Sequence, residues 1–257
     1  MDTKELFDLS NKTAIVTGGG RGLGEQMAYA LAEAGANVVV CSRNLEACQA
    51  VSKKLASLGA QSLALECDVT NENNISFVIA ETISHFGRID ILINNSGTSW
   101  VAPLLDYPED KWDKVMDVNV KGAFLFTQAA ARAMKDQGSG KIINIASVTG
   151  LRGAPTGFLD TPAYNTSKGA LMVLTKDLAV KLAPYNIQVN SIAPGLFPTK
   201  MTASMEKTNK ILLKKIPAGR FGKNEDIKGT ALFLASSASD YVTGHTLVVD
   251  GGLTATI

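Results

Sequence analysis

A doubly wound α/β fold is predicted by two features of the sequence. Short runs rich in β-branched residues alternate with longer segments whose apolar residues recur at helical spacing. Within the short runs the apolar residues are consecutive rather than alternating, which is typical of parallel strands covered by helices on both faces. A chain of 257 residues can build such a fold as one domain, so we expect a single domain over residues 1–257.

A parallel sheet of about seven strands is expected. The strands are predicted at residues 13–18, 37–42, 62–68, 89–95, 141–147, 187–194 and 246–252. Helical periodicity fills most of the segments between them. One long irregular stretch remains at residues 194–216, and long loops in compact domains are usually functional or mobile. We therefore predict that residues 194–216 form a substrate loop.

The composition narrows the class of partner. Apolar residues make up 46% and charged residues 19% of the chain, which fits a compact protein rather than a disordered or fibrous one. The formal net charge is +1 and both signs are scattered, so we expect neither a nucleic-acid surface nor membrane binding. No apolar run is long enough for a membrane span, and the amino terminus lacks the apolar core of a secretory signal. The expected partners are small molecules or further copies of the chain.

The cysteines and histidines indicate neither a disulfide framework nor a metal site. Cys41, Cys48 and Cys67 are odd in number and lack the spacing of a zinc site, so we expect reduced thiols in a cytoplasmic protein. His85 and His245 are isolated in the sequence and are expected to be structural or surface residues.

A glycine-rich turn follows the first predicted strand. Gly18, Gly22 and Gly24 stand where this strand gives way to a helix. Glycine permits positive φ and a close approach to a ligand, and a helix amino terminus offers free N–H groups and a partial positive charge. The Gly-x3-Gly-x-Gly spacing differs from the common dinucleotide fingerprint, but its place between strand and helix predicts a pyrophosphate-binding turn. A glycine turn without a ligand is the alternative.

The second predicted strand ends without the carboxylate that usually holds the ribose diol of NAD. Arg43 stands there instead, and together with Arg21 of the glycine turn it is suited to clamp a 2′-phosphate through charge-assisted hydrogen bonds. The sequence therefore favours NADP(H). NAD(H) stays open, because either arginine can also be a solvated or stacking side chain.

The motifs of the chain resemble those of the short-chain dehydrogenase/reductase family over essentially the whole length. The motifs occur in the order that is usual in that family. They are TGGGRGLG, CDV, NNSG, Asn119 in DVNVKGAF, Ser147 in INIASVTG, YNTSK, APG and the closing VTGHTLVVDGG. The resemblance implies a Rossmann-type fold, a nicotinamide cofactor and a homotetramer. One departure is Ser96, where the family usually has alanine in NNAG.

The resemblance also assigns cofactor contacts residue by residue. Asp68 and Val69 are expected to contact the adenine, and Asn95 and Gly97 the ribose. The nicotinamide is expected to contact Pro194, Gly195 and Thr199. Thr199 is expected to reach the carboxamide. With the glycine turn, the arginine and the catalytic pair, the expected set is Gly18, Gly20, Arg21, Gly22, Leu23, Gly24, Arg43, Asp68, Val69, Asn95, Gly97, Tyr164, Lys168, Pro194, Gly195 and Thr199.

A tyrosine and a lysine lie four residues apart at the predicted start of a helix, so Tyr164 and Lys168 share one face. Reducing a ketone needs a hydride from one side and a proton delivered to the oxygen. The pKa of tyrosine, about 10, is high for this work near neutrality, and we expect the charge of Lys168 to lower it. The resemblance adds that Lys168 bonds the nicotinamide ribose, that Ser147 holds the substrate oxygen and that Asn119 orders a relaying water. A packed tyrosine beside a solvated lysine is the alternative.

Several functions are open. The PAGRFG and VTGHTLVVDGG segments resemble 3-oxoacyl-[acyl-carrier-protein] reductases, so reduction of a 3-oxoacyl thioester in fatty acid biosynthesis is the leading prediction, with acyl carrier protein as a candidate partner. An acidic carrier protein needs a basic docking site, and MKDQGSGK and LAPYNIQ are poor in positive charge. The main rival is a sugar-acid or polyol dehydrogenase such as a gluconate 5-dehydrogenase, with Arg152 as a carboxylate partner. A non-catalytic dinucleotide-binding sensor is the third function, and the intact catalytic set counts against it.

Two segments are expected to shape the substrate pocket. The segment between Ser147 and Tyr164 is longer than is usual in the family. Apolar cover over the substrate is expected from Phe197, Met201, Met205, Leu212 and Leu213 of the predicted loop.

Overall fold

The computed structural model describes residues 2–153, 160–198 and 213–256. Seven parallel strands form one sheet in the order β3-β2-β1-β4-β5-β6-β7. The strands are β1 (Thr13–Thr17), β2 (Asn37–Ser42), β3 (Ser62–Glu66), β4 (Ile91–Asn94), β5 (Gly140–Ile145), β6 (Ile187–Pro194) and β7 (Thr246–Val249). The predicted doubly wound sheet is confirmed. All seven predicted strands are found, with the predicted limits in β2 and β6 and with ends shifted by one to three residues in the others.

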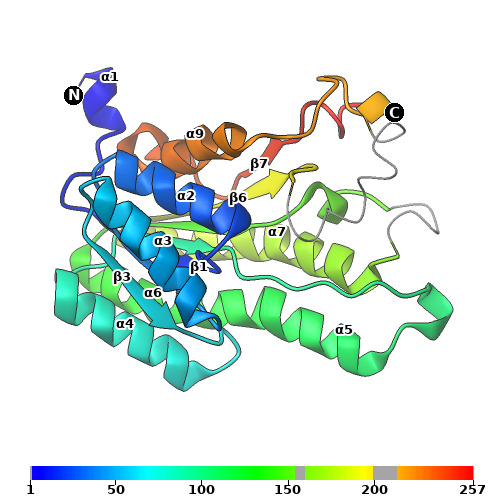
Figure 1. Ribbon diagram of the computed structural model, residues 1–257, viewed down its shortest axis with the longest axis horizontal. Coiled ribbons are helices and arrows are strands. Elements are labelled where there is room, and N and C mark those ends of the chain that lie inside the picture. Colours follow the sequence, from blue (N-terminus) through cyan, green and yellow to red (C-terminus); the bar gives the residue numbers. More distant parts are fainter. Residues whose placement is uncertain (1, 154–159, 199–212, 257) are drawn as a thin grey trace.

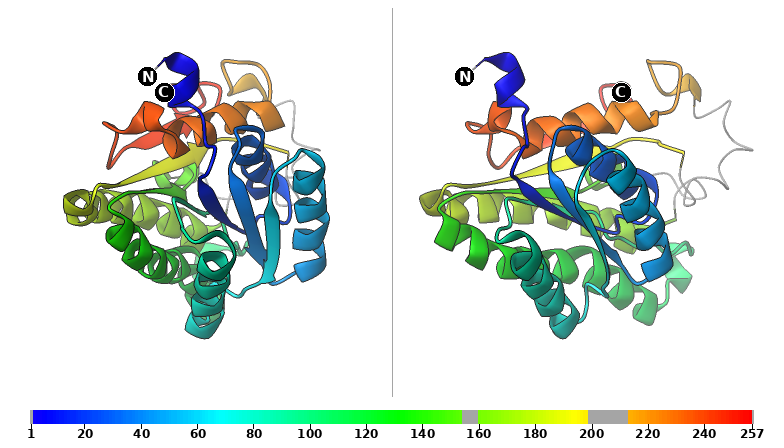
Figure 2. Two further views of the ribbon diagram at one scale, coloured as in Figure 1. Left: turned by 90° about the vertical axis from the view of Figure 1, so that its left-hand side faces the viewer. Right: turned by 60° about the vertical axis from the view of Figure 1, so that its left-hand side comes forward.

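Helices cover both faces of the sheet (Figures 1 and 2). The helices are α1 (Thr3–Leu6), α2 (Gly22–Glu33), α3 (Leu45–Ser57), α4 (Glu72–Phe86), α5 (Glu109–Met116), α6 (Gly122–Gln137), α7 (Pro162–Leu182) and α9 (Asn224–Ala235). Residues of α2, α3 and α9 share one apolar cluster with the sheet, and residues of α4, α6 and α7 share the other. Short helical turns are η1 (Leu104–Asp106), η2 (Asp117–Lys121), η3 (Val148–Gly150), η4 (Ala183–Tyr185) and η6 (Ser237–Ser239).

The two apolar clusters explain why apolar residues are consecutive in the strands. In β2, Val38 and Val40 face the cluster that contains α2 and α3, whereas Val39 faces the cluster that contains α4 and α6. All three side chains are fully buried. Burying a side chain of this size contributes about 1.5–3 kcal/mol, so both faces of the central strands stabilise the fold.

Helix ends coincide with capping residues. The Asn44 side chain accepts a hydrogen bond from the Ala47 amide at 2.9 Å and caps the amino terminus of α3. Asn71 caps α4 in the same way. Gly87 and Gly138 end α4 and α6 in the left-handed conformation, which glycine adopts without steric cost.

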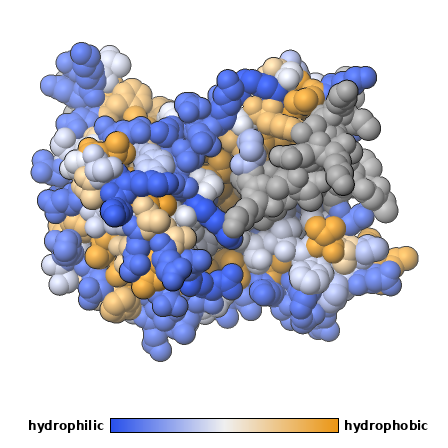
Figure 3. Space-filling view, viewed as in Figure 1, coloured by the Kyte–Doolittle hydropathy of each residue, from blue (hydrophilic) through white to orange (hydrophobic). Residues whose placement is uncertain are grey.

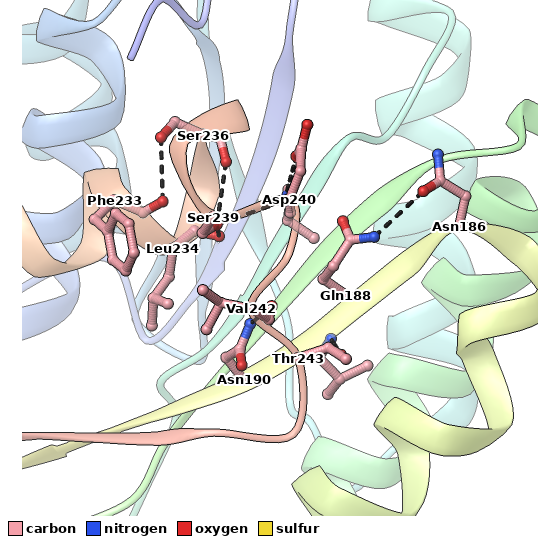
Figure 4. Close-up of polar contacts among 12 residues, drawn as sticks. Asn186, Gln188, Asn190, Phe233, Leu234, Ser236, Ser239, Asp240, Val242 and Thr243 are labelled. Carbon is pink, nitrogen blue, oxygen red and sulfur yellow. Dashed lines mark hydrogen bonds and ion pairs between the residues drawn. The ribbon is translucent and has the colours of Figure 1, made fainter. Parts of the chain in front are cut away.

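Side-chain hydrogen bonds fasten the segment before β7 to β6 (Figure 4). The Asn190 amide donates to the Val242 carbonyl at 2.7 Å, and the Val189 amide donates to the Thr243 hydroxyl at 3.1 Å. The buried Lys141 ammonium donates to Asp240 at 2.7 Å. This network lies at the amino-terminal end of β6, opposite the edge where the strands end.

The cysteines and histidines take the positions expected of structural or surface residues. Cys41, Cys48 and Cys67 are buried free thiols, and His85 and His245 are exposed. Within the described ranges, no three His, Cys, Asp or Glu side chains gather to hold a metal ion. None of the helices in those ranges is both long and apolar enough to cross a membrane.

Candidate active site

The predicted site residues gather where the strands end. The winding of the sheet reverses between β1 and β4, and open α/β sheets bind ligands outside the carboxyl ends of their strands at such a point. The glycine turn follows β1, NNSG follows β4, Ser147 follows β5, and Pro194 ends β6. The sheet thus brings motifs that are distant in sequence to one edge.

The glycine turn has the backbone that its residues predict. Gly18 and Gly22 have φ angles of 64° and 58°, a region that favours glycine. A Cβ on Gly24 would lie 2.4 Å from Asn95 Nδ2 and 2.5 Å from the Gly18 carbonyl oxygen, and a Cβ on Gly20 would lie 3.1 Å from Ala47 Cβ. The turn therefore presents bare backbone beside the amino terminus of α2, as a phosphate-binding turn requires. Within it, Arg21 is exposed, and Leu23 packs against the core.

Thr17 joins the ends of β1 and β4, and the sequence reasoning missed it. Its hydroxyl accepts hydrogen bonds from the Asn95 and Ser96 amides, both at 3.0 Å. The Asn95 side chain in turn donates to the Thr17 carbonyl at 2.9 Å and to the Gly18 carbonyl at 3.2 Å. A hydroxyl directly before the first glycine was the signal that could have identified this contact. NNSG is thereby held against the glycine turn.

The residues predicted to contact the adenosine lie where β2 and β3 end. Arg43 is exposed directly after β2. Burial acts to raise the pKa of Asp68, but hydrogen bonds from Thr70 and the charges of Arg43 and Lys114 lower it. Thr70 donates to the Asp68 carboxylate from its amide at 2.9 Å and from its hydroxyl at 2.8 Å. Val69, next in the chain, is buried. Asp68 is therefore an ionised, oriented acceptor beside an arginine.

Asn119 lies in η2, a π-helical turn between α5 and α6. Its side chain is buried, accepts from the Thr98 amide at 2.8 Å and donates to the Thr98 carbonyl at 3.0 Å. It also donates to the Ser167 hydroxyl at 2.9 Å, which itself donates to the Tyr164 carbonyl at 2.7 Å. Single π-turns inside helices are frequent at functional sites, and this one aims the asparagine at α7. A Cβ on Gly97 would lie 3.5 Å from Asn119 Oδ1, so Gly97 sits beside the amide.

Helix α7 presents Tyr164 and Lys168 on one face, as the spacing predicts. The helix begins at Pro162, a residue suited to the first helical position. The Lys168 ammonium is buried, donates to the Ile145 carbonyl at 2.6 Å and lies 5.4 Å from the centre of the Tyr164 ring. Lys168 thereby ties α7 to the end of β5.

Ser147 faces the phenol of Tyr164. The Ser147 hydroxyl is near enough to the phenol to lower its pKa, and it accepts from the Thr149 amide at 3.2 Å at the start of η3. A Cβ on Gly150 would lie 2.6 Å from the Gly169 amide nitrogen, so η3 is seated directly on α7. A hydroxyl pair of this kind can bind one oxygen between two donors.

Burial shifts the pKa values of Tyr164 and Lys168 in opposite directions. It lowers the pKa of Lys168 to about 8. It raises the pKa of Tyr164, and the nearby Ser147 hydroxyl opposes this only in part. The net shift of the Tyr164 pKa is therefore upward and not downward as expected, because burying a phenolate is costly.

The end of β6 forms the side of the site predicted for the nicotinamide. The Gly195 amide donates to the Val249 carbonyl at 2.9 Å, and a Cβ on Gly195 would lie 2.7 Å from Asp250 Cα. Pro194 is buried directly before it, and Leu213 is described and partly buried. Phe197 was predicted as substrate cover, but its ring is buried and packs against Gly222 in the core. Outside the described residues lie Thr199, Met201, Met205 and Leu212.

Two further features border the site. Arg152 is exposed after η3. Burial acts to raise the pKa of Asp250, but hydrogen bonds from Thr254 and Gly252 and the charge of Arg152 lower it. Exposed apolar side chains occupy the end of the molecule that holds η1 and the start of α5 (Figure 3). These side chains are Trp100, Val101, Leu104, Leu105 and Trp112.

Comparisons with known proteins agree with this geometry. A family model described as Enoyl-(Acyl carrier protein) reductase matches residues 18–254. A relative from Dickeya dadantii named 2-dehydro-3-deoxy-D-gluconate 5-dehydrogenase is 40% identical over 250 residues, which cover 96% of each chain. The chain belongs to the short-chain dehydrogenase/reductase family.

Other members of the family are equally similar along the whole chain. A NAD-dependent glycerol dehydrogenase from Listeria innocua is 39% identical over 252 residues, which cover 96% of each chain. The crystal structure of a gluconate 5-dehydrogenase from Burkholderia cenocepacia in complex with NADP and tartrate has a TM-score of 0.94 and 39% identity, and each chain is covered completely. The predicted family and fold are thereby confirmed. The names of these relatives favour the sugar-acid and polyol alternative over the leading prediction of fatty acid biosynthesis, which they do not support.

Proposed function

We propose that this short-chain dehydrogenase/reductase interconverts a ketone and a secondary alcohol on a sugar acid or polyol, with NADP(H) as the favoured cofactor. The observation that carries this proposal is the buried ammonium of Lys168, which donates to the Ile145 carbonyl at 2.6 Å, two residues before Ser147, and lies 5.4 Å from the centre of the Tyr164 ring. A dinucleotide-binding sensor has no need of a buried proton donor next to a cation. The relatives named as sugar-acid and polyol dehydrogenases support the substrate class.

The described residues fit a nicotinamide dinucleotide. The bare backbone of the glycine turn suits a pyrophosphate, and Gly24 stands where any side chain would clash with Asn95. Gly97 leaves open the space beside Asn119 Oδ1 and Lys168 Nζ, which would lie 3.5 Å and 3.7 Å from a Cβ there. When bound, the nicotinamide supplies or accepts the hydride. The other cofactor residues named from the sequence remain part of this proposal.

Each member of the catalytic set has one role. Tyr164 donates the proton to the carbonyl oxygen in reduction and accepts it in oxidation. Ser147 holds that oxygen with its hydroxyl. Lys168 stabilises the phenolate when it forms, because an ammonium nearby favours that charged state. Asn119 is fixed by the Thr98 backbone and orders the water that relays protons toward Lys168.

NADP(H) is favoured by charge at the adenosine end. Arg21 and Arg43 are both exposed beside the turn, and the second strand ends in no carboxylate. A 2′-phosphate there gains charge-assisted hydrogen bonds. The Burkholderia cenocepacia relative is described with NADP, whereas the Listeria innocua relative is named NAD-dependent, so NAD(H) is the alternative cofactor.

The substrate class is tested by measuring absorbance of the reduced cofactor. Purified protein is assayed with 5-keto-D-gluconate and NADPH or NADH, and with gluconate or glycerol and the oxidised cofactors. Acetoacetyl-CoA with the same reduced cofactors tests the thioester reading. Turnover of a sugar acid or glycerol supports the proposal. Turnover of the thioester alone would refute the proposed substrate class and favour an acyl thioester as substrate, with acyl carrier protein as the partner to test.

The catalytic assignment is tested by Tyr164→Phe, with Tyr241→Phe as the control because it makes the same change at a fully exposed tyrosine. Tyr164→Phe should abolish nearly all turnover and leave NADPH affinity unchanged, and Tyr241→Phe should behave as wild type. Substantial turnover by Tyr164→Phe would refute the role of proton donor. The family resemblance further supports a homotetramer, which light scattering on the purified protein would test.

A further inference from the structure

A row of polar side chains crosses the sheet just before the catalytic edge. Asn94, Asn144, Ser191 and Thr246 are register partners on the adjacent strands β4, β5, β6 and β7. The face of the sheet on which Asn94 and Asn144 lie is otherwise apolar. Leu92 and Ile142, two residues before them on the same strands, belong to the apolar cluster on that face. A buried polar side chain is costly unless it is hydrogen-bonded. The bonds of this row therefore need a structural or functional explanation.

The two asparagines connect two helices through the sheet. Asn94 Nδ2 donates to the Thr127 hydroxyl of α6 and to Asn144 Oδ1, both at 2.9 Å. Asn144 Nδ2 donates to the Thr175 hydroxyl of α7 at 3.0 Å, and that hydroxyl donates to the Leu171 carbonyl at 2.7 Å. All four side chains are buried, with at most 4% of their surface exposed. The result is one continuous chain of hydrogen bonds between α6 and α7, in which Asn94 donates toward both helices.

Each element in this chain carries a member of the catalytic set. Helix α6 continues directly from η2, which holds Asn119. Asn144 lies in β5, three residues before Ser147, which follows the end of that strand. Thr175 stands seven residues after Lys168 on α7, which is about two helical turns. The hydrogen-bond chain therefore links the supports of all the catalytic side chains.

Apolar contacts alone fix such a helix less tightly. Packing through residues such as Leu178 is non-directional, so it tolerates small rotations of α7 against β5. A hydrogen bond between an amide and a hydroxyl fixes both distance and angle. A misplacement of about 1 Å at a catalytic group can cost about 100-fold in rate. A rotation of α7 would separate Tyr164 from Ser147, because they stand on different elements.

We propose that Asn144 and Thr175 are positioning residues that set the rotation of α7 against β5 and so hold Tyr164 and Lys168 in register with Ser147. This inference rests on the proposed catalytic role of those three residues, although not on the identity of the substrate.

The test compares two threonines that differ only in the network. Thr175 and Thr82 are both fully buried in helices, and each hydroxyl donates to the carbonyl four residues before it at 2.7 Å. Thr175 alone of the two also accepts from Asn144. Thr175→Val, Thr175→Ser and Thr82→Val are made in the full chain. Hydrogen exchange of the amides of residues 162–172 is measured without substrate, and kcat against pH is measured with 5-keto-D-gluconate and NADPH.

Thr175→Val should speed exchange in residues 162–172, lower kcat at least tenfold and shift the apparent pKa of the pH profile. Thr175→Ser keeps the hydroxyl and should restore the kinetics, and Thr82→Val should leave both readouts unchanged. Equal exchange in the Thr175→Val and Thr82→Val variants would overturn the proposal, and so would faster exchange with an unchanged kcat and pH profile. If the wild type does not turn over 5-keto-D-gluconate, the proposed function fails on that substrate, while the exchange comparison still decides whether the network holds α7.

Discussion

The substitution Gly24→Ala is the most direct test of the phosphate turn. A methyl group at this position would lie 2.4 Å from Asn95 Nδ2 and 2.5 Å from the Gly18 carbonyl oxygen. Neither neighbour is free to move away, because the Asn95 amide already donates to the Thr17 and Gly18 carbonyls. The methyl group therefore either displaces Asn95 or pushes the glycine turn outward.

The size of the effect follows from these contacts. Overpacking costs about 1–3 kcal/mol, and each hydrogen bond that Asn95 loses contributes about 1 kcal/mol. If Asn95 moves and loses both bonds, the protein is destabilised by about 3–5 kcal/mol, which corresponds to a fall in Tm of about 6–20 °C for a chain of this length. If the turn moves instead, the cost weakens cofactor binding, and each increase of about 1.4 kcal/mol raises Kd tenfold. We expect both Asn95 and the turn to move, so that NADPH binds at least about tenfold more weakly.

The assay is the enhancement of NADPH fluorescence on titration with protein, with Tm measured on the same samples. Gly229→Ala is the control, since Gly229 lies in α9 with ordinary helical φ and no atom within 4 Å of the added Cβ. This variant should keep the affinity for NADPH and gain about 0.5–1 kcal/mol of stability. A Gly24→Ala protein with native affinity and native Tm would show that the turn tolerates a side chain and is not a close cradle for phosphate.

Three further changes test separate parts of the structure. Arg43→Asp should weaken NADPH binding by about 10- to 100-fold and shift the preference toward NADH, because a charge-assisted hydrogen bond contributes about 1.5–3 kcal/mol. A retained preference for NADPH in titrations would exclude Arg43 as the phosphate ligand. Burial lowers the pKa of Lys168 from 10.5 to about 8, so between these values the unfolded chain binds more protons and this group makes stability rise with pH. Lys168→Met lacks this rise, and a Tm difference from wild type that stays constant between pH 8 and 10 would contradict the buried ammonium. Asp90 accepts from Arg88 Nε and Nη2 at 2.7 and 2.6 Å and from the buried Thr13 amide at 3.0 Å. Asp90→Ala should therefore cost about 1–3 kcal/mol in urea unfolding, chiefly because it leaves that amide without an acceptor, and kcat of the folded protein should not change.

Much of the fold was predictable because each strand has an unambiguous local pattern. The run at residues 37–42 was expected as a strand and is β2 with the same limits. The third strand was expected to residue 68 but ends at Glu66, because Asp68 turns to bind Thr70 and Asn74 at the carboxyl edge. Hydrophobic periodicity does not show where a residue stops pairing with the neighbouring strand and forms a local turn instead.

The site was predictable where it depends on short-range spacing and not where it depends on long-range contacts. The pair Tyr164 and Lys168 follows from the four-residue spacing in a helix. The π-turn around Asn119 depends on hydrogen bonds to Thr98, which is distant in sequence, and the role of Thr17 depends on the pairing of β1 with β4. Such contacts exist only once the sheet is assembled.

The electrostatics of Tyr164 and Lys168 also depend on the assembled fold, and they could not be inferred from the four-residue spacing alone. Burial raises the pKa of Tyr164 and lowers that of Lys168 to about 8, so each group alone favours its neutral form. A phenolate beside an ammonium relieves both penalties at once, because each charge then faces the other in a poorly solvated site. At neutral pH the phenol keeps its proton and the lysine keeps its charge, which is the state that reduction of a ketone needs.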